Sequence, residues 1–122
     1  MDQPGKTPAP SGTRRIRLGD FARAKREGRR WAMLTSYDQY TASIFDDAGV
    51  WALLVGDSAA NNVLGYADTV PVTVEELLML TRAVRRGLKT PLLVGDLPFG
   101  SYEASDAQAI ETAHRLDRKS VV

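Results

Sequence analysis

Short apolar runs alternate with amphipathic segments along most of the chain, and the amphipathic segments carry helix caps. A capping residue or capping box precedes three of them, and a glycine follows three. The pattern predicts helices from near Asp20 to Gly28, over 39–48 with Asp38 as N-cap and Gly49 as the stop, over 73–86 before Gly87, and from Ser105 to about Leu116. Apolar runs predict strands at 31–35, 51–55 and 91–94, the first two of them buried. Because these strands alternate with helices, the expected class is α/β with a parallel sheet.

The two ends of the chain differ from this body. Residues 1–13 are rich in Pro, Gly, Ser and Thr, and we expect a disordered leader there. Residues 117–122 match the translation of a widely used short-read sequencing adapter, which next meets a stop codon. We therefore expect a domain over 14–116 and a non-native tail over 117–122. Three strand–helix units cannot close a parallel barrel, which needs about 250 residues.

Composition limits the function classes. The chain has 122 residues, a net charge of +1 and no cysteine, which fits one cytoplasmic domain without disulfides or thiolate chemistry. No apolar run is long enough to span a bilayer. The stretch 14–30 carries eight Lys and Arg residues against two acidic ones. We interpret it as the solvated face of a terminal helix, and we expect neither nucleic acid nor membrane as a partner.

Two aspartates at the ends of predicted strands are the main candidates for chemistry. Asp57 follows the second apolar run and Asp96 follows the third. Alone, each is typical of a turn. Together, on neighbouring parallel strands about 4.8 Å apart, they would emerge at the end of the sheet where ligands bind in α/β folds. Carboxylate oxygens suit a hard cation such as Mg²⁺.

Other polar residues near that end of the sheet are less decisive. Ser58 follows Asp57 at the start of a small polar loop. Asp38 is interpreted mainly as a helix cap, and Tyr37 as either pocket wall or packing. His114, the only histidine, is expected on the surface of the last helix.

Several motifs in a fixed order resemble one enzyme family. They are Met33–Asp38 (MLTSYD), Val55–Ser58 (VGDS), Leu64–Tyr66 (LGY), Val70–Thr73 (VPVT), Ala83–Gly87 (AVRRG) and Asp96–Tyr102 (DLPFGSY). Together they resemble the N-terminal part of ketopantoate hydroxymethyltransferase, over roughly residues 14–116. Gly95 stands where the family often has alanine, and 59–61 replaces a frequent Leu-Gly-Met. Both departures flank the candidate residues without removing them.

The resemblance implies a fold and a reaction. The fold would be the first three β/α units of a (β/α)₈ TIM barrel, preceded by a short helix and truncated. The reaction would be magnesium-dependent transfer of a hydroxymethyl group from 5,10-methylenetetrahydrofolate to 3-methyl-2-oxobutanoate, giving 2-dehydropantoate in pantothenate biosynthesis. The family also implies a homodecamer for the full-length enzyme.

By motif match, the resemblance assigns roles to three residues. Asp57 and Asp96 would hold Mg²⁺, and Asp57, Ser58 and Asp96 would contact substrate. The family's third metal ligand, its substrate-contacting lysine and its general base have no counterpart in this sequence, so we assign no catalytic residue. We expect the chain alone to lack transferase activity and to fold poorly, with an unpaired edge on its third strand.

Three alternatives stay open at this point. One is another magnesium-dependent α-keto-acid barrel, similar to phosphoenolpyruvate mutase or isocitrate lyase. Another is a receiver-like signalling domain, which would need an acidic pair after the first strand. The last is a non-catalytic fragment that only binds partners.

Overall fold

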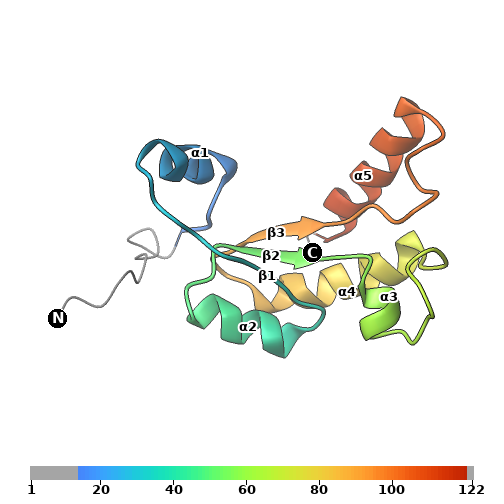
Figure 1. The fold of residues 1–122 in the computed structure, drawn as a ribbon, viewed down its shortest axis with the longest axis horizontal. Helices are drawn as coiled ribbons and strands as arrows, with labels where there is room; N and C mark the ends of the chain where they lie inside the picture. Colours follow the sequence, from blue (N-terminus) through green and yellow to red (C-terminus); the bar gives the residue numbers. More distant parts are fainter. Residues whose placement is uncertain (1–13, 121–122) are drawn as a thin grey trace.

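The computed structural model describes residues 14–120, with side chains through residue 118. The predicted leader at 1–13 and the last two residues of the predicted tail lie outside this part. The helices are α1 (Leu18–Arg26), α2 (Gln39–Asp47), α3 (Ala59–Asn62), α4 (Val74–Gly87) and α5 (Asp106–Ser120), and the strands are β1 (Met33–Thr35), β2 (Ala52–Val55) and β3 (Leu92–Gly95) (Figure 1).

The three strands form one parallel sheet in the order β1-β2-β3, which confirms the predicted α/β class. The register places Leu34 beside Leu53 and Leu53 beside Leu93. Because all three strands run the same way, the loops after them leave from one end of the sheet, here called the carboxyl end. This end carries the candidate site.

Helices α2 and α4 lie together along one face of the sheet (Figure 1). The core between these layers contains the apolar residues Ala42, Leu53, Val55, Leu77 and Val84, each with no exposed surface. The hydrophobic effect of burying these side chains fixes the helices to the sheet.

The two helices approach closely at Gly87, the last residue of α4. A Cβ atom at Gly87 would lie 2.4 Å from the carbonyl oxygen of Gln39 in α2. The close approach therefore requires glycine at this position.

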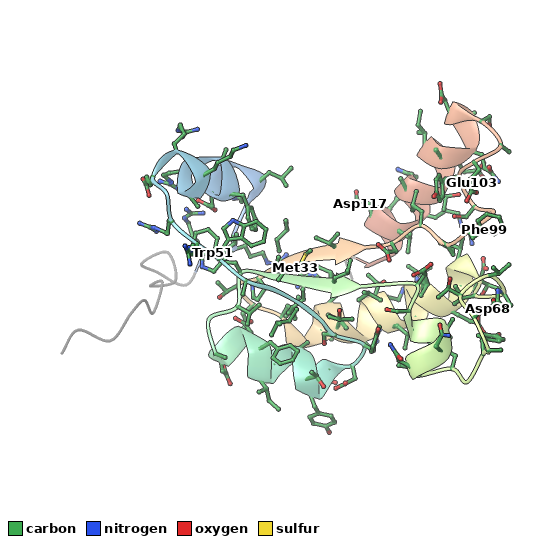
Figure 2. The ribbon with its side chains drawn as sticks, in the orientation of Figure 1. Met33, Trp51, Asp68, Phe99, Glu103 and Asp117 are labelled. Atoms are coloured by element: carbon green, nitrogen blue, oxygen red, sulfur yellow. The ribbon has the colours of Figure 1, made fainter. Side chains whose placement is uncertain are left out.

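Helix α1 lies near the amino ends of the strands, apart from α2 and α4 (Figure 1). Phe21 of α1 packs edge-on against Trp31 and Trp51, with ring centroids 4.6 and 5.7 Å apart. Trp51, labelled in Figure 2, is buried, and its indole N–H has no partner within the described residues. This aromatic cluster attaches the N-terminal helix to the body of the fold.

Asp20, buried in the first turn of α1, is surrounded by donors. It accepts a hydrogen bond from the backbone N–H of Arg17 at 2.8 Å and forms ion pairs with Arg14 and Arg23 at 2.6 and 2.5 Å. These interactions, that with Arg14 foremost, hold the pKa of the Asp20 carboxyl far below its usual range.

The predicted N-caps and the stop at Gly49 are confirmed, whereas Gly87, predicted to follow the helix, is its last residue. The Asp38 carboxylate accepts a hydrogen bond from the backbone N–H of Thr41 at 2.8 Å at the start of α2. Gly49 follows the end of α2 with φ at +81°. Thr73 and Glu76 form a capping box at the start of α4. Ser105 accepts from the N–H of Gln108 at 3.1 Å before α5. These boundaries follow from local chemistry.

Three predictions about elements were wrong in detail. The first strand is shorter than predicted and exposed, with Met33 at 46% and Leu34 at 40%, because β1 is an edge strand and one of its sides has no neighbour in the described sheet. The loop after Asp57 contains the short helix α3, which buries Ala59 and Ala60. Helix α5 continues through Ser120 rather than ending near Leu116.

The extension of α5 does not test the predicted non-native origin of residues 117–122, since a helix can contain native and non-native residues alike. Across residues 14–120, no helix is long and apolar enough to cross a membrane.

Candidate active site at the carboxyl end of the sheet

Asp57 and Asp96 are adjacent at the carboxyl end of the sheet. Asp96 directly follows β3, and its backbone N–H donates to the carbonyl oxygen of Val55 at 3.0 Å. Asp57 lies two residues beyond β2, and its backbone N–H donates to the Oδ2 atom of Asp96 at 3.0 Å. The parallel pairing of β2 and β3 therefore places the Asp96 carboxylate against the backbone of Asp57. The two aspartates lie at the same end of the sheet, as predicted.

The other carboxylate oxygens of Asp57 and Asp96 can still bind a ligand. Neither the Asp57 carboxylate nor the Oδ1 atom of Asp96 makes a hydrogen bond or ion pair within residues 14–118. Both residues are half-buried. Carboxylate oxygens that emerge together at one end of a sheet are suited to a hard cation.

Gly56 allows oxygen atoms to gather at this point. A Cβ atom at Gly56 would lie 3.1 Å from the Oγ atom of Ser58 and 3.2 Å from the Oδ2 atom of Asp96. Both oxygens thus occupy the space beside the Gly56 backbone, and any larger residue would push them outward. The constraint at Gly56 comes from this close approach and not from its φ, which is not positive, and an added Cβ atom would displace the two oxygens by a few tenths of an ångström.

Ser58 is held by a tyrosine from another loop. Its Oγ atom lies 2.7 Å from the hydroxyl oxygen of Tyr37, in the β1–α2 connection. The side-chain amide of Asn62, in α3, donates to the same Tyr37 oxygen at 3.4 Å. From the sequence, Tyr37 could be either a pocket wall residue or a packing residue, and Asn62 had no assigned role. The polar composition of the loop after Asp57 was the one feature that pointed to Asn62.

The remaining candidates lie apart from this cluster. Asp38 caps α2, and hydrogen bonds from the Thr41 hydroxyl and N–H lower the pKa of its carboxyl. His114 is exposed on α5, as predicted. Tyr66 donates to Glu76 at 2.7 Å, a bond that raises the pKa of the tyrosine and lowers that of the glutamate. That bond ties the loop after α3 to the start of α4.

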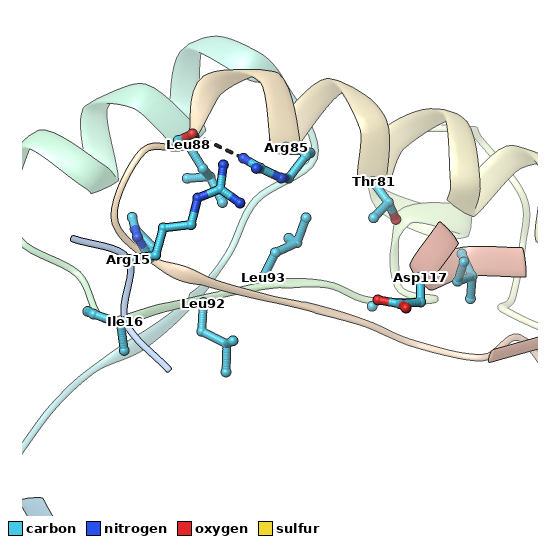
Figure 3. A pocket seen from close by; sticks show the side chains of 11 residues that line it. Arg15, Ile16, Thr81, Arg85, Leu88, Leu92, Leu93 and Asp117 are labelled. Carbon is cyan, nitrogen blue, oxygen red and sulfur yellow. Dashed lines mark hydrogen bonds between the residues drawn. The ribbon is translucent and has the colours of Figure 1, made fainter. Parts of the chain in front are cut away.

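The cavity in Figure 3 is separate from the candidate site. It measures about 180 Å³ and lies beside β3, between α4 and α5. Its lining includes Arg15, Arg85 and Asp117 but none of the three predicted site residues, and Arg85 is turned toward the carbonyl oxygen of Leu88 at 3.3 Å. The cavity adjoins the side of β3 that has no partner strand in the described sheet.

Comparison with known proteins gives the family. The family model described as ketopantoate hydroxymethyltransferase matches residues 15–122. The chain belongs to this family. The resemblance seen in the motifs is thereby confirmed, in preference to a receiver-like domain or to the phosphoenolpyruvate mutase and isocitrate lyase group.

Individual relatives of the ketopantoate hydroxymethyltransferase family agree. The chain is 61% identical to the 3-methyl-2-oxobutanoate hydroxymethyltransferase of Saccharopolyspora erythraea, over 92% of this chain and 40% of that protein. It is 54% identical to the enzyme of the same name from Streptomyces avermitilis, over 91% of this chain and 39% of that protein. It is 55% identical to that of Thermobifida fusca, over 90% of this chain and 41% of that protein. The chain thus spans about 40% of the length of these relatives.

Proposed function

We propose that this chain provides part of the active site of a magnesium-dependent hydroxymethyltransferase. The reaction transfers a hydroxymethyl group from 5,10-methylenetetrahydrofolate to 3-methyl-2-oxobutanoate and gives 2-dehydropantoate, a step of pantothenate biosynthesis. The hydrogen bond from the Asp57 N–H to the Asp96 carboxylate supports this function most directly, because it joins the two candidate ligands at the end of the sheet where α/β enzymes bind ligands.

The donor set fits magnesium. We propose Asp57 and Asp96 as the protein ligands; the described residues contain no group of three or more His, Cys, Asp and Glu side chains that could hold a metal ion. Mg²⁺ commonly takes one or two protein carboxylates and fills the other positions with water and substrate. Bound between Asp57, Asp96 and an α-keto acid, the ion would draw electron density from the keto group and acidify the neighbouring C–H bond.

The chain's own residues have distinct tasks in this proposal. The Asp57 N–H fixes the Oδ2 atom of Asp96, which leaves Oδ1 to face a ligand. We expect the hydroxyl of Ser58, which lies beside Gly56, to donate a hydrogen bond to a substrate oxygen. No side chain near this cluster is assigned as the general base. We expect the base, the third metal ligand and the lysine from the remaining part of the whole protein, and no turnover from this chain alone.

The fold supports the same proposal. Three parallel strands in sequential order, with helices between them, fit the first three β/α units of a TIM barrel. In such a barrel, catalytic groups come from the carboxyl ends of several strands, which is where Asp57 and Asp96 lie. A cytoplasmic homodecamer is the assembly that we propose for the whole enzyme.

A chimera tests this function. Residues 15–116 replace the aligned part of the Saccharopolyspora erythraea relative, and formation of 2-dehydropantoate is measured with and without Mg²⁺. We expect the chimera to be active with Mg²⁺, and the Asp57→Asn and Asp96→Asn variants to fall to background. Asp38→Asn is the matched control, because asparagine caps a helix as well as aspartate does. An inactive chimera, or unchanged activity in the two site variants, would refute the proposal.

A further inference from the structure

We propose that Tyr37 is a positioning residue that sets the direction of the Ser58 hydroxyl proton, so that Ser58 donates to the α-keto acid. This inference rests on the proposed function and adds to it the source of the Ser58 orientation. Tyr37 itself is not placed among the residues that touch substrate.

The position of Tyr37 is fixed by the sheet. The preceding residue, Ser36, is 1% exposed, and its N–H donates to the carbonyl oxygen of Leu54 in β2 at 3.0 Å. The next residue, Asp38, caps α2. With both neighbours held, the tyrosine ring reaches across to Ser58, and the two hydroxyl oxygens lie 2.7 Å apart. This is the distance of a well-formed O–H···O hydrogen bond.

Either hydroxyl could donate in that bond, and the contact with Asn62 favours Tyr37 as the donor. A side-chain amide nitrogen can donate but cannot accept. Since the amide of Asn62 points at the Tyr37 oxygen at 3.4 Å, this oxygen acts as acceptor toward α3. In the proposed arrangement, the tyrosine's own proton goes to Ser58, whose Oγ atom lies within hydrogen-bond distance. The Ser58 oxygen accepts it, and the Ser58 proton is left for another acceptor.

The backbone around Ser58 supports a role outside helix capping. Ser58 occupies the N-cap position of α3, where a serine oxygen usually accepts a hydrogen bond from a helix N–H. Ser58 makes no such bond, and its Oγ atom is turned to Tyr37 instead. The same atom lies near the Asp96 carboxylate, since both are within 3.2 Å of the Cβ position of Gly56. A ligand held by Asp96 is therefore close to the Ser58 hydroxyl.

The resulting order of donors is Asn62 to Tyr37, Tyr37 to Ser58, and Ser58 to substrate. An α-keto acid offers only acceptor oxygens at its keto and carboxylate groups. A serine whose proton is directed to these oxygens binds such a ligand better than one whose proton is taken up by a neighbour. Tyr37 and Asn62, which are not proposed as metal ligands, thus contribute to recognition of the keto acid through Ser58.

The chimera described above tests this order of donors. In Tyr37→Phe, we expect the KM for 3-methyl-2-oxobutanoate to rise about tenfold, the effect of one lost hydrogen bond to a polar or charged group. The KM for the folate should be unchanged. In the double variant with Ser58→Ala, Tyr37→Phe should add nothing further, because the tyrosine acts only through the serine.

Asn62→Asp tests the direction of the bonds. Its carboxylate would accept the tyrosine proton and reverse the order, so the KM for the keto acid should rise as in Tyr37→Phe. Asn61→Asp, which adds the same charge one residue away, controls for electrostatics and should change KM less than twofold. Melting temperatures of all variants separate these effects from unfolding.

The outcomes distinguish the two proposals. An active chimera with an unchanged keto-acid KM in Tyr37→Phe refutes the role of Tyr37 and leaves the proposed function intact. Additive effects of Tyr37→Phe and Ser58→Ala also refute it, as does an equal response to Asn61→Asp and Asn62→Asp. A chimera without activity refutes the proposed function, and the role of Tyr37 with it.

Discussion

Replacing Gly87 by alanine tests whether the close approach of α2 and α4 maintains the fold. The new Cβ atom would lie 2.4 Å from the carbonyl oxygen of Gln39 and 3.1 Å from the Cβ atom of Ala42. The first contact involves backbone, which cannot move away by rotating a side chain. The two helices would have to separate, and the buried side chains between them and the sheet would lose contacts.

The magnitude follows from two opposing effects. Overpacking a well-packed site costs about 1–3 kcal/mol, and a contact to backbone this short belongs at the upper end of that range. Alanine is better than glycine in a helix by up to about 1 kcal/mol. The net expectation is a loss of about 2 kcal/mol in the free energy of unfolding. With a typical slope of about 2 kcal/mol per molar urea, the midpoint would fall by about 1 M.

Urea denaturation of the chimera, followed by tryptophan fluorescence, measures this loss, since Trp51 is 3% exposed. Gly19→Ala in α1 is the matched control. A Cβ atom there meets nothing within 4 Å, so the same change should be neutral or slightly stabilising. Equal midpoints for the two variants would show that α2 and α4 do not approach as described.

The other predictions concern the N-terminal half and the site. Asp38→Ala should cost about 1 kcal/mol of unfolding free energy, because the N–H of Thr41 loses its cap, and Asp38→Asn should restore stability in the same urea titration. The folded pKa of Asp20 lies below its unfolded value of about 3.9, so its contribution to stability is complete above pH 4 and is lost as the pH falls through the folded pKa. Melting temperature should therefore drop on acidification, and Asp20→Asn should lower it at pH 7 and flatten the acid slope, whereas parallel profiles would exclude this linkage. Gly56→Ala should lower the melting temperature only slightly, because it displaces side-chain oxygens rather than backbone, yet in the chimera it should reduce Mg²⁺-dependent turnover. Full activity in Gly56→Ala would contradict the proposed geometry of the site.

Local sequence determined the elements with strong end signals. The capping box at Thr73, the N-cap at Asp38 and the glycine at 49 act within a few residues of themselves, so α2 and α4 begin and end near the predicted positions. The motif order also determined the family, because each motif stands in sequence independently of how the chain folds.

The candidate site was predictable in part. Two aspartates after apolar strands suggested a shared end of the sheet, and the hydrogen bond from the Asp57 N–H to Asp96 agrees with that expectation. Their roles as metal ligands stay a prediction. The link between Tyr37 and Ser58 was not predictable, because it joins residues 21 positions apart through the register of β1 and β2.

The sequence by itself determined where α2 and α4 begin and end, which strands are apolar, and to which family the chain belongs, since all three depend on neighbours along the chain. The tertiary structure alone decided that β1 is exposed, that Gly87 meets the backbone of α2, and that the side chains of Ser58 and Asn62 both meet the Tyr37 hydroxyl. These features depend on which segments lie side by side in space. The apolar pattern of a strand is the same at the edge of a sheet and at its centre, and hydrogen-bond partners from distant segments meet only once the layers have packed.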